Sequence, residues 1–197
     1  MPSPSDPDAS LMLQVQAGDK AAFEELVRKY QSPVINTIYR MLGDRWEAED
    51  LSQQVFVQVL RSAKRYKPTA KFSTFLFTIV RHLTLNELRR RARHPADSLD
   101  EPARGAGDEQ ERQVADARAT APDIEAIQNE LEKRVRAAIE SLPEQQRLAI
   151  ILLRYEEKSY DEICKILRCS LPSLKSLIHR ARLTLKQDLA AYLEKRE

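Results

Sequence analysis

Residues 159–182 read SYDEICKILRCSLPSLKSLIHRAR, and this stretch decides the fold of the C-terminal part of the chain. Ser159 can cap the first turn of a helix, and Glu162, three residues on, can bond back to the helix start. Ser170 can cap a second helix that has Pro172 in its first turn, where a missing N–H costs nothing. Two capped helices joined by a short turn predict a helix-turn-helix.

The second of these helices has an apolar and a polar side. Leu174, Ile178, Ala181 and Leu185 recur at helical spacing and predict the inner face. Short polar donors and long cations lie on the outer face, as readout of base edges and phosphates in the major groove requires. A solvated charged helix in an ordinary bundle is the alternative. The outward residues are Ser173, Lys175, Ser176, His179, Arg180 and Arg182.

Composition favours helix along the whole chain. Four Gly, 42 % hydrophobic residues and a near absence of strand-like alternation predict an all-α protein. We expect helices from about Ser10 to a break at Gly18, after Ser32-Pro33, over 44–66 and over 73–93. A further run of helices then fills the C-terminal part.

Polar segments divide these helices into two groups. The Pro-rich residues 1–9 predict a disordered tail. Residues 95–122 carry a net charge of −4 and little apolar surface, which predicts a flexible acidic linker. The expected organisation is therefore a tail over 1–9, a helical domain over 10–94, the linker over 95–122, and a second helical domain over 123–193.

The segment from Arg61 to Arg93, called here the basic segment, has ten Lys or Arg against one acid, Glu87. Tyr66 and Phe72 bracket a Pro-containing loop in this segment, where we expect their rings to face solvent. Cations bind phosphates, and exposed rings stack on unpaired bases at about 1–3 kcal/mol per base. The alternative is a solvated basic helix whose rings lie in the core. A chain that binds both opened and intact DNA indicates promoter recognition.

Several classes of protein are disfavoured. No apolar stretch reaches membrane-spanning length and the N-terminus lacks a signal-peptide core, so we expect a cytoplasmic protein without membrane insertion. We expect Cys164 and Cys169 to be small buried side chains, with a redox switch or metal site as the alternative. No phosphate-binding Gly loop or nucleophile–base pair appears, so we predict no catalytic residue, metal or cofactor. A metal-dependent enzyme would need scattered ligands from among His82, His94, Cys164, Cys169 and His179.

Several motifs in order resemble those of bacterial sigma-70 factors. FEELVRKY (23–30), EAEDLSQQVF (47–56) and FSTFL (72–76) resemble the second region of that family. LPEQQR (142–147), SYDEI (159–163) and KSLIHRAR (175–182) resemble its fourth region. With only these two regions and a short linker, the chain is similar to the extracytoplasmic-function (ECF) group.

The resemblance implies three contact surfaces and a promoter-directing role with core RNA polymerase. The helix over 170–182, from Ser170 onward, would read the −35 duplex, and an anti-sigma factor would regulate the protein. The residues that would dock on the clamp helices of the polymerase's largest subunit are Asp50, Leu51, Gln53, Gln54 and Phe56. Those that would capture and melt the −10 strand are Tyr66, Lys67, Lys71, Phe72, Ser73, Arg81, Asn86, Arg89 and Arg90.

Two departures from the family pattern affect the helix-turn-helix. Arg168 stands where Gly is common, which predicts a looser or differently shaped turn. Leu177 stands where an Arg often contacts DNA, which removes one expected contact. A stand-alone repressor or activator that dimerises on palindromic sites is the alternative function, but it would leave the basic segment without a role.

Overall fold

The computed structural model describes residues 6–93 and 122–193, and every regular element in these ranges is helical. The predicted all-α class is confirmed. Residues 1–5 and the predicted linker up to residue 121 lie outside the described residues. The elements are α1 (Pro7–Gln16), α2 (Lys20–Leu42), α3 (Arg45–Ser62), the 3-10 turn η1 (Ala63–Arg65), α4 (Phe72–Arg93), α5 (Pro122–Glu140), α6 (Glu144–Arg154), α7 (Tyr160–Leu167) and α8 (Leu171–Leu193).

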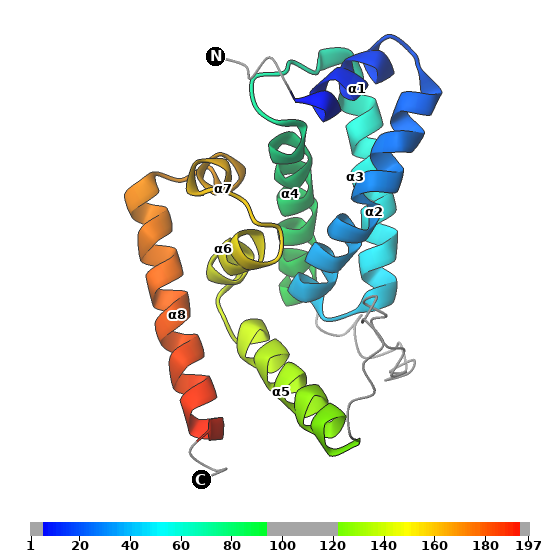
Figure 1. Cartoon of the computed structure of the whole chain (residues 1–197). Helices are drawn as coiled ribbons and strands as arrows, with labels where there is room; N and C mark the ends of the chain where they lie inside the picture. Colours follow the sequence, from blue (N-terminus) through cyan, green and yellow to red (C-terminus); the bar gives the residue numbers. More distant parts are fainter. Residues whose placement is uncertain (1–5, 94–121, 194–197) are drawn as a thin grey trace.

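Helices α1 to α4 form the N-terminal half of the molecule (Figure 1). α2 packs against α3 and α1, and α4 packs against both α3 and α2. Leu26, Val34, Val55, Leu76 and Val80 come from three different helices and are all buried in the core between them. Burial of such apolar stripes, at roughly 25 cal/mol per Å² of apolar surface, holds the bundle together.

Two predicted helix boundaries are wrong. α1 begins at Pro7 instead of Ser10, because the Asp6 carboxylate caps it and Asp8 and Ala9 are buried against the bundle. Residues 6–9 are therefore not part of a disordered tail. The helix start predicted after Ser32-Pro33 does not occur, because Pro33 lies inside the continuous helix α2. Proline removes one intrahelical bond, but the buried stripe of α2 continues on both sides of it.

Helices α5 to α8 form the C-terminal half, and α6, α7 and α8 all pack on one another. The capping box is confirmed: the Ser159 N–H donates to the Glu162 carboxylate at 2.8 Å, and the Glu162 N–H donates to Ser159 Oγ at 3.3 Å. Arg168 itself adopts the left-handed conformation at the end of α7, with φ 54°.

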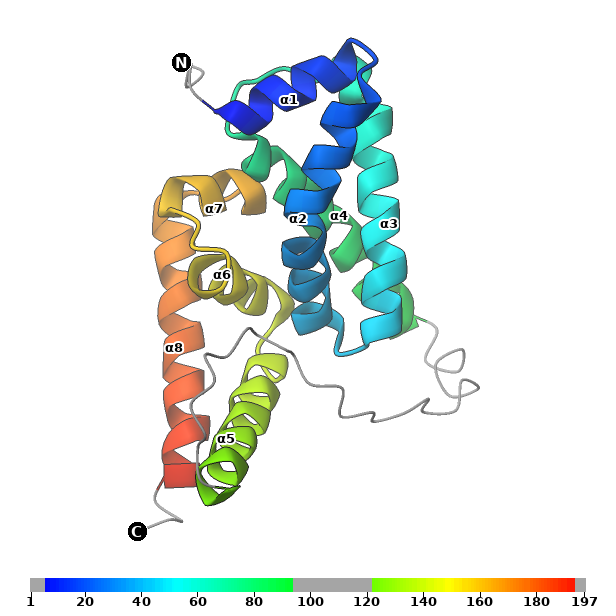
Figure 2. The same ribbon diagram turned by 45° about the vertical axis from the view of Figure 1, so that its right-hand side comes forward.

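The two halves contact each other through α4 with α7 and through α2 with α5 and α6. Figures 1 and 2 both show α7 beside the start of α4, with α3 and α8 on opposite sides of the molecule. Arg147 of α6 donates to the Met41 carbonyl near the end of α2 at 2.8 Å, and Thr37 donates to Glu156 at 2.9 Å. Polar contacts therefore join the halves as well as apolar ones.

Candidate nucleic-acid interface

The outer face of α8 is built as the sequence predicts. Ser170 Oγ accepts a bond from the Ser173 N–H at 3.4 Å and caps the helix, while Leu174, Ile178 and Ala181 are fully or almost fully buried. The polar residues between these positions must therefore face outward. All seven predicted DNA-reading residues are exposed: Ser170, Ser173, Lys175, Ser176, His179, Arg180 and Arg182. We call this set the α8 surface.

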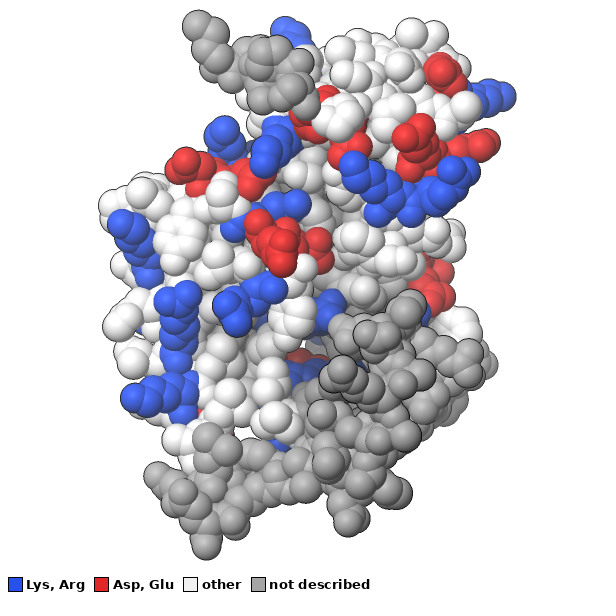
Figure 3. Space-filling view, viewed as in Figure 1, with Lys and Arg blue, Asp and Glu red and all other residues white. Residues whose placement is uncertain are grey.

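The α8 surface is cationic and slightly hollowed. Lys175, Ser176, His179 and Arg180 line a shallow depression. Figure 3 shows Lys and Arg side chains along the left side of the molecule, where α8 lies in Figure 1. Within residues 6–93 and 122–193, no acidic side chain forms an ion pair with a cation of this surface. These cations are therefore available to an external anion such as a DNA phosphate.

The rings at the start of α4 are not placed as predicted. Phe72 is fully buried and Tyr66 is 6 % exposed, and Ser73 is buried beside them. The Phe72 ring lies 5.4 Å from the Tyr30 ring and the Tyr66 ring lies 5.1 Å from the Phe75 ring, between centroids. The expectation that Tyr66 and Phe72 face solvent is wrong, because they complete an aromatic cluster of the core. Burial raises the pKa of the Tyr66 hydroxyl to about 12.

The polar residues predicted to bind the −10 strand differ in exposure. Lys67, Lys71, Asn86, Arg89 and Arg90 are exposed, as binding to a DNA strand requires. Arg81 is half-buried, and its burial, together with the nearby charges of Arg168 and Arg89, lowers the pKa of its guanidinium.

One acid binds two of the arginines near the end of α4. Glu87 pairs with Arg90 at 2.9 Å and with Arg91 at 3.6 Å. Arg91 also donates to the Leu42 carbonyl at the end of α2 at 3.1 Å and pairs with Glu47 of α3. Arg91 therefore serves the packing of the N-terminal half, whereas Arg89 and Arg90 keep exposed side chains.

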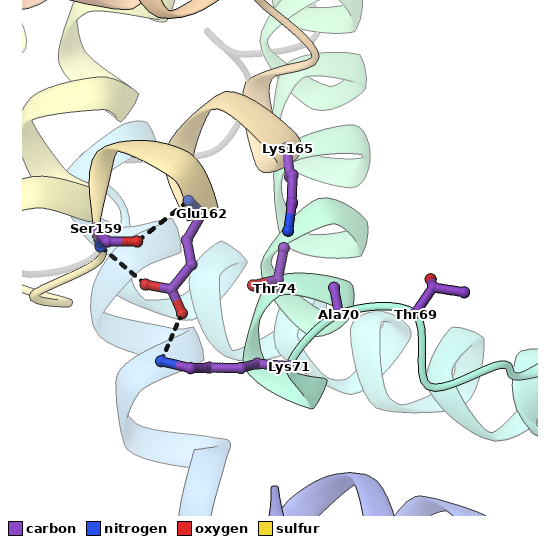
Figure 4. A pocket seen from close by; sticks show the side chains of 7 residues that line it. All are labelled: Thr69, Ala70, Lys71, Thr74, Ser159, Glu162 and Lys165. Atoms are coloured by element: carbon purple, nitrogen blue, oxygen red, sulfur yellow. Dashed lines mark hydrogen bonds and ion pairs between the residues drawn. The ribbon is translucent and has the colours of Figure 1, made fainter. Parts of the chain in front are cut away.

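α7 approaches the start of α4 closely. Lys71 pairs with Glu162 of the capping box at 3.0 Å, and Figure 4 shows the two side chains pointing toward each other across a small pocket. Burial alone would raise the pKa of Glu162, but hydrogen bonds from the Ser159 N–H and from Lys71 outweigh it, so the pKa is lowered. The Lys158 ammonium lies 5.1 Å from the centre of the Phe77 ring of α4. Lys71, a cation of the basic segment, thus forms an ion pair with the C-terminal half of the molecule.

Only part of the predicted polymerase-docking set is accessible. Asp50, Gln53 and Gln54 are exposed on α3. Leu51 and Phe56 are 7 % and 8 % exposed and pack into the core. They face inward because their spacing matches Val55 and Val59 on the buried side of α3.

A row of exposed apolar residues on α3 was missed by the sequence prediction. Trp46 is 71 % exposed, Val57 is 47 % exposed and Leu60 is 50 % exposed. Positions 46, 50, 53, 57 and 60 are spaced three or four apart and share one side of the helix, which we call the α3 face. The spacing of these residues is visible in the sequence, but their exposure is not. Exposed apolar groups gathered on one face mark an interaction surface.

Among the residues that the structure describes, the thiols and imidazoles form no site for a metal. Among the described residues, no group of three or more His, Cys, Asp or Glu side chains is placed to hold a metal ion. His94, one of the ligands considered, lies outside the described residues. Cys164 and Cys169 are free and half-buried, and the Cys169 N–H donates to the Cys164 carbonyl at 3.1 Å. Within the described residues, no helix has the length and apolar character needed to span a bilayer.

Two family models match the two halves of the chain. Residues 26–94 match the family model for Sigma-70 region 2, and residues 132–185 match that for Sigma-70, region 4. The chain is 33 % identical to the RNA polymerase sigma-H factor of Pseudomonas aeruginosa over 190 residues, covering 94 % of this chain and 95 % of the relative. The chain belongs to the sigma-70 family. It is also 33 % identical to the ECF RNA polymerase sigma factor SigW of Bacillus subtilis, covering 89 % of this chain and 93 % of the relative, which places it in the ECF group.

Two solved structures have the same fold as this sigma factor. CnrH, in complex with the cytosolic domain of CnrY, superposes with a TM-score of 0.68 at 23 % identity and covers 94 % of this chain and 99 % of its own. The sigma factor RpoE of Bartonella quintana, in complex with the anti-sigma factor NepR, superposes with a TM-score of 0.64 at 22 % identity and covers 85 % of this chain and 96 % of its own.

Proposed function

We propose that this sigma factor directs core RNA polymerase to promoters by reading −35 duplex with the α8 surface. The observation that carries the proposal is that every predicted reading residue is exposed on one capped helix. Arg180 and Lys175 have the chemistry to bind base edges or phosphates, and His179 and the serines add shorter donors. Leu177, half-buried where relatives often have Arg, contributes no charged contact.

We propose that the exposed part of the basic segment holds the opened −10 strand. Lys67, Lys71, Arg89 and Arg90 supply cations, and Asn86 supplies an amide that can pair with a base. Tyr66, Phe72 and Ser73 support the loop from within instead of stacking on bases. Lys71 also pairs with Glu162, so a phosphate would compete with that carboxylate for the Lys71 ammonium.

We propose that the α3 face, with Gln54 beside it, docks on the clamp helices of the polymerase's largest subunit. A desolvated Trp is a frequent anchor of protein interfaces, which makes Trp46 the strongest contact on this face. Asp50 and Gln53 lie on the same face and supply hydrogen-bonding partners for basic and polar groups.

We further propose that an anti-sigma factor regulates this chain in the cytoplasm, and that the chain catalyses no reaction of its own. The two solved structures that share its fold are complexes with partners, one of them with a named anti-sigma factor. Melting then draws on the free energy of binding to the opened strand rather than on nucleotide hydrolysis by this chain.

In vitro transcription with purified core polymerase across a genomic fragment library tests the proposal. We expect discrete start sites that share −35 and −10 sequences and vanish when the sigma factor is omitted. Trp46→Ala should weaken association with the core enzyme at least tenfold, measured by fluorescence titration, while Leu13→Ala on the exposed side of α1 should not. Binding of the chain alone to palindromic duplex as a dimer, without any directed start site, would favour the repressor reading instead.

A further inference from the structure

Helix α1 closes over the loop between η1 and α4, here called the 66–71 loop. All of α1 precedes the match to Sigma-70 region 2, which begins only at residue 26. Figures 1 and 2 show α1 lying across the same end of the bundle as the start of α4. The contacts between α1 and the two ends of the loop assign it a role that the family match does not.

Gln16, at the end of α1, holds the first end of the loop. Its side-chain amide donates to the backbone carbonyls of Ala63 at 2.9 Å, Lys64 at 3.2 Å and Tyr66 at 3.4 Å. Carbonyls at the end of a short helix have no partners within the helix and need external donors. One side chain thus fixes the path of the backbone where the chain leaves η1.

Asp6 holds the other end of the loop. One of its carboxylate oxygens accepts the Phe72 N–H at 2.7 Å, and the other caps α1 by accepting the Asp8 N–H at 3.2 Å. Lys71 precedes α4 and has no side-chain acceptor, so it cannot cap this helix itself. Asp6 therefore supplies from α1 the negative charge and the acceptor that the start of α4 lacks.

Asp8 secures α1 against the bundle beneath these contacts. Its buried carboxylate accepts the Tyr30 hydroxyl at 2.6 Å and the Lys29 ammonium at 2.6 Å. The Tyr30 ring in turn packs on Phe72. Burial first, then the bond to Asp8, raises the pKa of Tyr30, which keeps its proton and remains the donor.

The loop itself has little internal structure. Within residues 66–71, the one backbone bond between loop residues is from the Thr69 N–H to the Lys67 carbonyl at 2.8 Å. Lys67 and Lys71 are exposed on this loop, and Pro68 lies between them. The backbone path that carries these two cations is therefore set by the anchors at the loop ends, while Glu162 holds the Lys71 ammonium at 3.0 Å.

We propose that Asp6 and Gln16 are positioning residues that hold the 66–71 loop in the conformation needed to capture the opened −10 strand. This inference rests on the proposed function of the basic segment. Loss of either anchor removes neither cation but lets the loop sample other conformations. Binding of the strand then costs the conformational entropy of ordering the loop. The −35 surface and the α3 face, which lie elsewhere, are unaffected.

The chain offers matched controls for both positions. Gln14 is the same residue type on the same helix, is exposed, and its side chain makes no hydrogen bond to the 66–71 loop, so Gln14→Ala is the control for Gln16→Ala. Asp19 caps α2 by accepting the Ala21 N–H at 2.8 Å and the Ala22 N–H at 3.2 Å. Asp19→Ala therefore removes a helix cap without touching the loop, and is the control for Asp6→Ala.

The test uses the full chain bound to core polymerase and a fluorescent single-stranded oligonucleotide of the non-template −10 sequence from the strongest mapped start site. We expect Asp6→Ala and Gln16→Ala to weaken strand binding about tenfold or more, with unchanged affinity for −35 duplex and core enzyme. Amide hydrogen exchange over residues 63–72 should become faster in both. Gln14→Ala and Asp19→Ala should change neither quantity, even where Asp19→Ala lowers the melting temperature.

The outcomes separate this inference from the proposed function. If the wild-type complex binds the strand and Asp6→Ala and Gln16→Ala bind it as their controls do, the positioning role is wrong and the proposed function stands. If the wild-type complex neither binds the strand nor directs a start site, both are wrong. Should Asp6→Ala fail to fold, Gln16→Ala decides the matter, because the side chain of Gln16 is exposed and its loss leaves the core intact.

Discussion

The α8 surface and the start of α4 are both rich in basic side chains, yet they are constructed differently. On α8 the helical period alone puts every predicted residue outside, and the apolar residues between them make the core. At the start of α4 the aromatic residues of the same segment are inside, and only the cations remain accessible. The sequence of a regular helix therefore predicts which side chains face solvent. The exposure of loop residues depends instead on the elements that pack over the loop.

The largest expected effect tests whether Phe72 belongs to the core. Phe72→Ala should lower the free energy of unfolding by about 3–5 kcal/mol, because a fully buried ring is removed from an aromatic cluster. Denaturant titration of the full chain measures it. Phe23→Ala, at a half-buried ring of α2, serves as the comparison and should cost less. A loss below about 1 kcal/mol together with a selective defect in promoter opening would restore the reading of Phe72 as a stacking residue.

The sequence predicts the helix-turn-helix well because its determinants are local. The capping box needs only Ser159 and Glu162, and the buried side of α8 needs only a three-four spacing. The burial of Phe72 instead depends on Tyr30, and on Asp6, which lies 66 residues away in the chain. No local sequence pattern encodes such long-range contacts. The sequence therefore predicts that the rings of Tyr66 and Phe72 are exposed, although both are buried.

The α3 face is predicted only in part from the sequence. Helical spacing predicts which residues share a side with Trp46, but not whether another helix covers that side. Leu60 lies next to the buried Val59 in the sequence, yet it is half exposed. Pro33 is predicted to interrupt the helix but does not. It lies within α2, because tertiary packing on both sides outweighs one lost hydrogen bond.

The next prediction tests whether the exposed cations of the α8 surface bind DNA without contributing to stability. Arg180→Ala and Lys175→Ala should each weaken −35 duplex binding by about 1–3 kcal/mol while leaving thermal stability unchanged, because both side chains are exposed. Fluorescence anisotropy of the complex with core polymerase on duplex promoter DNA measures the first, and thermal melting the second. Lys133→Ala on α5, also exposed, is the control and should bind as wild type. An equal loss in the control would indicate a general charge effect.

A smaller effect concerns the turn between α7 and α8. Arg168 occupies the left-handed region with φ 54°, which costs a non-glycine residue about 1–2 kcal/mol. Arg168→Gly should therefore stabilise the chain by about 1 kcal/mol, since the added freedom of glycine in the unfolded chain offsets part of the gain. It also removes a positive charge that lowers the pKa of Arg81. Chemical denaturation provides the measurement.

Glu157 is the matched control for that substitution, because it is the other non-glycine residue with positive φ among the described residues, at 49°. Glu157→Gly should give a similar gain in stability without any influence on Arg81. If Arg168→Gly destabilises the chain while Glu157→Gly stabilises it, the arginine side chain rather than the backbone decides the turn.

The smallest effect distinguishes two acids near the contact between the halves. Burial raises the pKa of Glu156, although Thr37 donates to it, so its contribution to stability is present below its unfolded pKa and is lost as pH rises through the folded pKa. The pKa of Glu162 is lowered, so its contribution is present above the unfolded pKa and is lost as pH falls through the folded pKa. The two acids therefore give stability opposite dependences on pH.

Glu156→Gln and Glu162→Gln separate these contributions, because glutamine keeps the acceptor for Thr37 in one case and the capping box in the other. As pH falls from about 7 toward 4.5, the unfolding free energy of wild type should rise relative to Glu156→Gln. Below 4.5 it should fall relative to Glu162→Gln. Denaturant titrations across this range give both differences. Parallel curves for wild type and Glu162→Gln would mean that the ion pair with Lys71 does not form in solution, and then the Lys71 ammonium would be as accessible as the cations of the α8 surface.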